Sequence, residues 1–151
     1  MYQRILVPVD GSEASKRGLQ EAIKLAKATN ARLQIVHVVN ELLLEAGFFG
    51  HQPYEPLIDS LRVSGAKILE EAKSATRDAG VEFGAELVDT IGGHVSPLIL
   101  DAARRVNADL IVMGTHGRRG VRRLLMGSDA EMVLRSSPVP VLFVRTRPEG
   151  D

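Results

Sequence analysis

The sequence lacks cysteine entirely and has no excess of either charge. Without cysteine, disulfide frameworks, thiolate nucleophiles and zinc sites with cysteine ligands are all excluded. Lysine plus arginine equals aspartate plus glutamate, at 19 each, so no overall electric field draws the protein toward nucleic acid or an anionic membrane. Any attraction for an anionic ligand must therefore be local.

Long apolar runs are also missing. No stretch approaches the roughly 18 apolar residues that suggest a transmembrane helix. The chain opens directly into a strand-like run, Arg4 to Val9, without a basic region, a long apolar region or a cleavage site of a signal peptide. Its 151 residues suit one compact domain. We expect a single domain over residues 1–151 in the cytoplasm, with no membrane or nucleic-acid partner.

Short runs rich in valine, isoleucine and leucine alternate with longer segments of helical period. This alternation predicts βαβ units and a parallel sheet. Nearly continuous apolar runs indicate central strands that helices cover on both faces, at Ile5–Val9, Leu33–Val39 and Leu110–Met113. Phe83–Leu87 alternates apolar with polar or small residues, which is typical of an edge strand with one wet face.

Four segments have apolar residues at helical spacing. The first is Ser12–Thr29, with Ser12 as N-cap, and the second is Leu57–Ala79, which Gly80 ends. The third carries its apolar face from Val95 to Val106. A short fourth helix opens at Ser128. Between the second strand and the second helix, Asn40–Pro56 is irregular, either a lid or an ordinary crossover connection.

The last strand, Val141–Val144, is apolar on both faces, yet two prolines lead into it and it comes last in the chain. These features favour an edge position. A bare apolar edge invites pairing with another chain. We therefore expect a homodimer that joins these strands, unless a loop covers the edge.

The most informative segment runs from Met113 to Asp129, between a buried strand and a helix. Glycine lets backbone N–H groups approach an anion closely, and a helix N-terminus adds unpaired N–H groups and a favourable dipole. Gly127 and Ser128 stand where the helix begins, and Gly114 and Gly117 can line the other side. Arginines without any acidic neighbour lie between them, at Arg118, Arg119, Arg122 and Arg123. The segment predicts a phosphate site.

A purely structural interpretation remains open, in which the segment binds no ligand. In that case Gly114 ends a strand, Gly127 permits a turn and the arginines are solvated. The spacing matches neither the Walker A pattern nor the dinucleotide fingerprint.

The spacing does resemble that of the universal stress protein family, whose ATP-binding members carry Gly, two residues, Gly, nine residues, then Gly and Ser or Thr. Here Gly114, Gly117, Gly127 and Ser128 match every fixed position. Nearly the whole chain shares the resemblance, from Ile5–Ser12 through the His37–Val38 pair and Ala108–Gly114 to Pro138–Val144. It implies a Rossmann-like α/β fold with an open five-stranded parallel sheet of order 3-2-1-4-5 and helices on both faces.

The resemblance also implies the ligand contacts. Phosphate contacts would come from Gly114, Gly117, Gly127 and Ser128, with Met113 and Arg118 beside them. Val38 would contact adenine, and Pro8, Val9 and Asp10 would flank the adenosine. Asp10 would accept hydrogen bonds from ribose hydroxyls or hold a metal-bound water; alternatively it is a turn residue before Ser12. Mg²⁺ would be held mainly through the phosphates.

The histidines give no metal signature, since His37, His51, His94 and His116 lack ligand spacing and a cysteine or paired carboxylate. We expect His37 to be satisfied locally. His116 can approach phosphate or lie exposed, and Gly92–His94 is a second anion-facing turn or a simple loop.

No residue can be identified from the sequence as the water-positioning group that phosphoryl transfer requires. The sequence therefore favours a regulatory ATP-binding protein of the stress response, with slow or no hydrolysis and with ADP or AMP as other possible ligands. The alternatives are a slow ATPase or phosphotransferase, and a dimeric interaction scaffold that needs no nucleotide.

Overall fold

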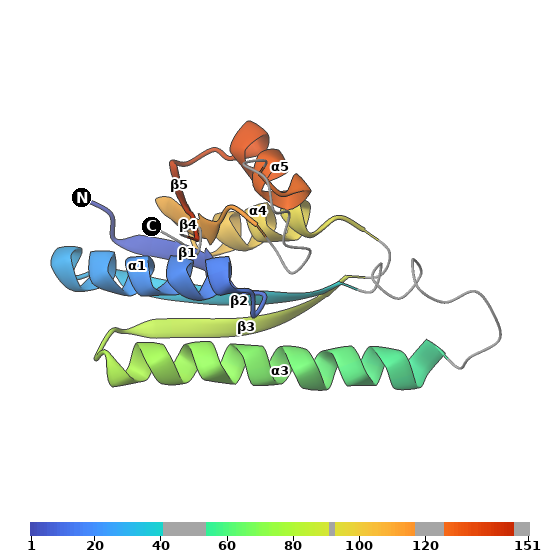
Figure 1. Cartoon of the computed structure of the whole chain (residues 1–151). Coiled ribbons are helices and arrows are strands. Elements are labelled where there is room, and N and C mark those ends of the chain that lie inside the picture. Colours follow the sequence, from blue (N-terminus) through green and yellow to red (C-terminus); the bar gives the residue numbers. More distant parts are fainter. Residues whose placement is uncertain (41–53, 91–92, 117–125, 147–151) are drawn as a thin grey trace.

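The computed structural model describes residues 1–40, 54–90, 93–116 and 126–146 (Figure 1). Its centre is a five-stranded sheet of order β3-β2-β1-β4-β5 in which every neighbouring pair is parallel. The strands are β1 (Arg4–Pro8), β2 (Arg32–Asn40), β3 (Phe83–Thr90), β4 (Leu110–Gly114) and β5 (Val141–Val144). The helices are α1 (Glu13–Thr29), α3 (Tyr54–Asp78), α4 (Val95–Arg105) and α5 (Ser128–Ser136). This is the predicted Rossmann-like α/β fold.

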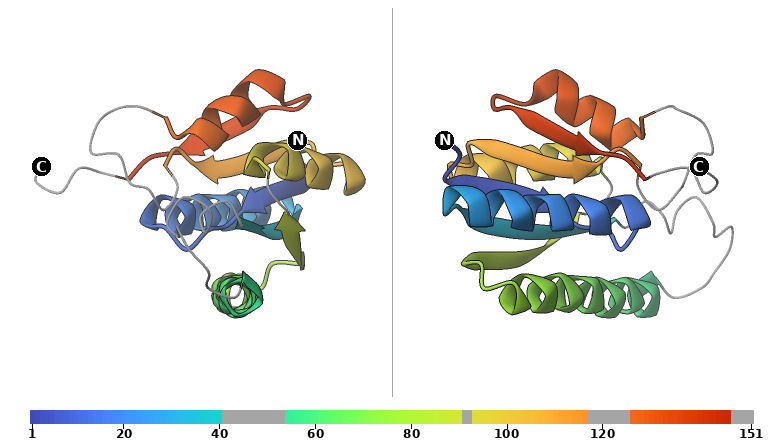
Figure 2. Two further views of the ribbon diagram at one scale, coloured as in Figure 1. Left: turned by 90° about the vertical axis from the view of Figure 1, so that its right-hand side faces the viewer. Right: turned by 60° about the vertical axis from the view of Figure 1, so that its left-hand side comes forward.

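Two apolar clusters, one on each face of the sheet, form the core. Consecutive residues of β1 are fully buried on opposite faces, since Ile5 packs with α1 and Leu6 packs with α4 and α5. Leu19 and Ala22 of α1 join the first cluster, and Ile99 of α4 and Val133 of α5 join the second. Burial on both faces explains why the central strands read as continuous apolar runs. Figure 2 shows the helices flanking the sheet from two further sides.

The edge strands are β3 and β5, as the sequence predicts. Two details differ from the expectation. β3 extends to Thr90 because it pairs with β2 along its whole length, from Leu33↔Phe83 to Asn40↔Thr90. The polar face of β3 was expected to contact only solvent, but it also contacts α4. Glu86 accepts two hydrogen bonds from Arg105 of α4, both at 3.0 Å.

The connection between β2 and α3 is shorter than expected at both ends. Asn40 is the last residue of β2, and Tyr54 is the first of α3, three residues before the expected start. The rest of the proposed lid or crossover, residues 41–53, lies outside the described residues. None of the described helices is long and apolar enough to cross a membrane.

Candidate functional site

The turn after β1 is fixed by hydrogen bonds within five residues of sequence. Asp10 accepts from the Ser12 N–H through Oδ1 at 2.8 Å, and its own N–H donates to Ser15 Oγ at 3.0 Å. Gly11, at φ 81°, supplies the left-handed conformation that the turn requires. Asp10 therefore forms the turn before Ser12, and its role toward a ligand stays a prediction.

Ser12 caps α1, as predicted. Its Oγ accepts from the Ser15 N–H at 3.2 Å, which satisfies one of the unpaired amides of the first turn. The same hydroxyl donates to the His116 carbonyl oxygen at 3.4 Å. Ser12 therefore joins the turn after β1 to the segment after β4.

The end of β4 is joined to the start of α5 as well. The Gly127 N–H donates to the Thr115 carbonyl oxygen at 2.8 Å, and the Thr115 N–H donates to the Val144 carbonyl oxygen at 3.1 Å. Sequence reasoning gave Thr115 no role, because nothing in its local sequence signals these distant partners. Three segments, after β1, after β4 and before α5, thus meet at the carboxyl edge of the sheet. This is where ligands bind in open α/β sheets, at the reversal of strand order between β1 and β4.

Gly114 has a packing role. A Cβ at this position would lie 2.7–2.9 Å from the backbone carbonyl group and Cβ of Ala14 in α1. Gly18, one turn further along α1, approaches the backbone of Met113 and Gly114 as well, with its own Cβ position 3.3 Å from the Gly114 nitrogen. The absence of a side chain at Gly114 lets α1 lie directly against the end of β4.

The helix α5 begins at Ser128, as the sequence predicts, and its N-cap is Gly127. Gly127 has φ −62° and ψ 156°, and its carbonyl accepts the first helical bond from Glu131. The bond from the Gly127 N–H to the Thr115 carbonyl oxygen joins this helix start to the end of β4. Ser128 is the first helical residue, and its side chain is exposed.

The first amides of α5 have no partner within the described part of the chain. The N–H groups of Ser128, Asp129 and Ala130 donate to no described residue, as is usual in the first turn of a helix. Asp129 and Glu131 place negative charge in the same turn. The helix end is therefore a set of backbone donors next to acidic side chains.

The residues expected near adenosine lie on neighbouring strands. Val38 of β2 and Met113 of β4 are buried in the same apolar cluster, on the face that α4 and α5 cover. Pro8 ends β1, and Val9 follows it, buried, with its N–H donating to the Val36 carbonyl oxygen. His37 is buried, with its Nδ1 2.6 Å from the Val9 carbonyl oxygen, which confirms that its ring is satisfied locally.

The other predicted contacts, Gly117 and Arg118, lie outside the described residues. So does His51, and so does Gly92 of the second proposed anion-facing turn. His94 is the N-cap of α4 but forms no side-chain capping bond. In the described ranges, no group of three or more histidine, cysteine, aspartate or glutamate side chains is placed to hold a metal ion.

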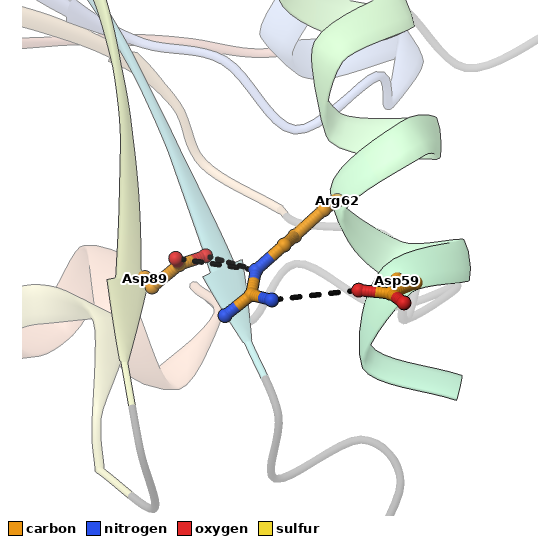
Figure 3. A network of polar contacts seen from close by, with 3 residues as sticks. All are labelled: Asp59, Arg62 and Asp89. Atoms are coloured by element: carbon orange, nitrogen blue, oxygen red, sulfur yellow. Dashed lines mark hydrogen bonds and ion pairs between the residues drawn. The ribbon is translucent and has the colours of Figure 1, made fainter. Parts of the chain in front are cut away.

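Beside this edge, α3 is tied to the end of β3 by Arg62 (Figure 3). The Arg62 Nε lies 3.3 Å from an Asp89 oxygen, and Nη1 lies 3.5 Å from Asp59 Oδ1. All three side chains are at least 41% exposed, so the contacts are worth at most about 1 kcal/mol each. Of the two contacts, the one with Asp89 joins α3 to β3, and the one with Asp59 lies within α3.

A surface hollow of about 250 Å³ lies away from this site, at the amino ends of β1 and β2, with Arg4, Arg32 and Gln34 among its lining residues. Arg32 is already paired with Glu82 at 2.9 Å. None of the residues that line the hollow belongs to the glycine-rich segment, so the carboxyl edge of the sheet remains the candidate site.

The family model for the universal stress proteins matches residues 1–145. The chain belongs to the universal stress protein family. Among curated members, it is 35% identical over 153 residues to the universal stress protein YxiE of Bacillus subtilis, covering 96% of this chain and 100% of that one. It is 32% identical over 145 residues to a universal stress protein of Methanocaldococcus jannaschii, covering 96% and 83%.

Solved structures of universal stress proteins share the fold. A universal stress protein solved with cAMP has a TM-score of 0.67 at 29% identity, covering 97% of this chain and 98% of that one. The Archaeoglobus fulgidus protein solved with dAMP has a TM-score of 0.69 at 26% identity, covering 95% and 98%. The hypothetical protein MJ0577 has a TM-score of 0.84 at 26% identity, covering 99% of both chains. Adenine nucleotides thus bind to two similar members of the family.

Proposed function

We propose that this universal stress protein binds an adenine nucleotide, ATP by preference, at the carboxyl edge of its sheet, and acts as a regulatory module in the stress response. The observation that carries the proposal is the hydrogen bond between Thr115 and Gly127, because it sets the unpaired amides of α5 beside the end of β4. The universal stress proteins solved with cAMP and dAMP support the choice of ligand.

The phosphates would be held by backbone donors. The amides of Ser128, Asp129 and Ala130 and the exposed Ser128 hydroxyl would point at phosphate oxygens, with Gly114, Gly117 and Arg118 completing the site. The Gly127 amide is already bonded to Thr115, so Gly127 would contribute space and position rather than a donor. The acidic side chain of Asp129 would have to turn away from the ligand.

The adenosine would lie across the ends of β2, β1 and β4, with Val38 at the adenine, Met113 beside it and Pro8 to Asp10 flanking the sugar. Asp10 already accepts one hydrogen bond from Ser12, which fixes the position of its carboxylate for a ribose hydroxyl or a metal-bound water. Mg²⁺ would be held mainly by phosphate oxygens and water, as this ion often is.

Binding with slow or no hydrolysis is the proposed activity. The bound nucleotide would alter which partners the protein contacts, in the cytoplasm, where adenine nucleotides are available.

We also propose a homodimer formed through the β5 edge. Val141 and Phe143 pack inward on one face, while Leu142 is 38% exposed, so an apolar side chain stands on an edge strand.

Calorimetric titration with ATP, ADP and AMP in the presence of Mg²⁺ tests the proposal, after removal of nucleotide retained from expression. We expect micromolar ATP affinity in the wild type and at least a tenfold loss in Gly127→Val. The backbone of Gly127 is in the extended region, which valine adopts readily, so the fold should remain stable.

Gly84→Ala is the matched control, since Gly84 lies on the edge strand β3 and should leave affinity unchanged. Absence of binding by the folded, nucleotide-free wild type would overturn the proposal in favour of an interaction scaffold. Steady phosphate release that disappears in Gly127→Val would instead identify a slow ATPase.

A further inference from the structure

One buried nitrogen in the candidate site has no hydrogen-bond partner among the described residues. His116 Nε2 is inaccessible to solvent and forms no hydrogen bond, a condition it shares among described side chains only with Ser96 Oγ. Buried polar atoms are nearly always hydrogen-bonded, and one left unpaired is costly. An atom of this kind at a ligand site indicates a contact that the ligand completes.

The surroundings of His116 fix the ring. Its Nδ1 lies 2.9 Å from Thr115 Oγ1, and Thr115 is only 5% exposed. Its carbonyl oxygen accepts from Ser12 Oγ, and the neighbouring Thr115 carbonyl accepts from the Gly127 N–H. The ring is therefore attached to a backbone that is anchored to both α1 and α5.

The contact with Thr115 has a consequence for the other nitrogen. When the threonine hydroxyl donates to Nδ1, the neutral ring carries its proton on Nε2. The buried Nε2 is then a donor that lacks an acceptor. Among the parts of a nucleotide, the phosphate oxygens are strong acceptors, and His116 lies two residues after Gly114 in the glycine-rich segment.

We propose that His116 Nε2–H donates a hydrogen bond to a phosphate oxygen of the bound nucleotide, and so makes the site select nucleotides over nucleosides. The proposal rests on the proposed function, because it assigns a specificity-determining residue to that same site. Thr115 acts as a positioning residue, since it holds the tautomer in which Nε2 carries the proton.

Two substitutions separate this role from simple packing. His116→Asn can keep a polar atom near Thr115 but has no group at the Nε2 position, whereas His116→Gln can extend an N–H donor close to that position. We expect about a tenfold loss of ATP affinity in His116→Asn and recovery of most of it in His116→Gln, the size of effect known for hydrogen bonds to charged groups. Adenosine affinity should stay within about twofold of the wild type in both variants.

The titrations should include inorganic phosphate, which separates a nucleotide contact from a free-anion site. Competition of phosphate with ATP at equal affinity would show a free-anion site and overturn the selection of nucleotides. If the wild type binds ATP and His116→Asn binds it equally well, the inference falls while the proposed function stands. If the folded wild type binds no adenine nucleotide, both fall.

A spectroscopic measurement tests the ring directly. In ¹⁵N-labelled protein, long-range ¹H–¹⁵N correlation should show the neutral His116 ring protonated at Nε2, with the Nε2 resonance shifting when ATP is added. Thr115→Val should remove the preference for that tautomer. A neutral ring protonated at Nδ1 in the wild type would contradict the proposal, because Nε2 would then be an acceptor.

Discussion

At the scale of single residues, Gly114 has a structural reason to be glycine that is independent of any ligand. A side chain there would collide with the backbone of Ala14, which cannot move without shifting α1. We expect Gly114→Ala to lower the free energy of unfolding by about 1–3 kcal/mol, as overpacking usually does. Urea denaturation measures the change in midpoint.

Gly84→Ala is the control for this substitution. Its Cβ would meet Gln34 Oε1, but that atom is the end of a flexible side chain that can move aside. We expect the control to change stability by less than about 0.5 kcal/mol. Equal destabilisation by the two substitutions would show that the contact with Ala14 is not the cause.

Contacts between residues close in sequence can be predicted from the sequence, whereas contacts between distant residues cannot. The turn at Asp10 and the cap at Ser12 depend on partners within a few residues, so both were predictable. The contact of Gly114 with Ala14 joins positions that nothing in the sequence pairs. Likewise, the Asp109 carboxylate accepts from the N–H groups of Gln3 and Arg4, more than one hundred residues away.

At the scale of elements, the start of α1 links stability to the site. Ser12→Ala removes the bond to the Ser15 N–H and the contact with the His116 carbonyl. We expect a loss of about 1 kcal/mol in the free energy of unfolding, the usual cost of an N-cap. Urea denaturation measures it, with Ser74→Ala, an exposed position within α3, as the matched control.

The control should be neutral or slightly stabilising, because alanine is the better helix former. An unchanged midpoint in Ser12→Ala would mean that the cap observed here contributes nothing to the stability of α1.

The sequence predicted all five strands and four helices of the described residues, because burial on both faces and helical spacing leave strong patterns. It failed at boundaries that tertiary contacts determine. β3 runs on to Thr90 through its pairing with β2. The positions of the proposed phosphate contacts at Gly117 and Arg118 stay predictions.

At the scale of the whole molecule, the open edge of β5 makes a prediction about assembly. No described strand pairs with its outer side, and Leu142 is 38% exposed. We expect a dimer at micromolar concentration and a mainly monomeric Leu142→Lys, because lysine on an edge strand opposes pairing. Sedimentation velocity measures both masses.

Val63→Lys is the control, since Val63 is 72% exposed on α3 and α3 packs near the opposite edge of the sheet. It should leave the dimer intact. A wild type that sediments as a monomer would refute the β5 interface, and loss of the dimer in Val63→Lys alone would move the interface to α3.

The close contact between α1 and the end of β4 also bears on how descent should be traced in this family. The packing of α1 against β4 favours glycine at position 114 whatever the protein binds, whereas the backbone of Gly127 is in the extended region that other residues adopt. In a lineage released from its ligand, mutation would therefore erase Gly127 and Ser128 while purifying selection kept Gly114. The presence of Gly114 in a relative therefore indicates common descent, whereas the presence of Gly127 indicates that the relative still binds its ligand.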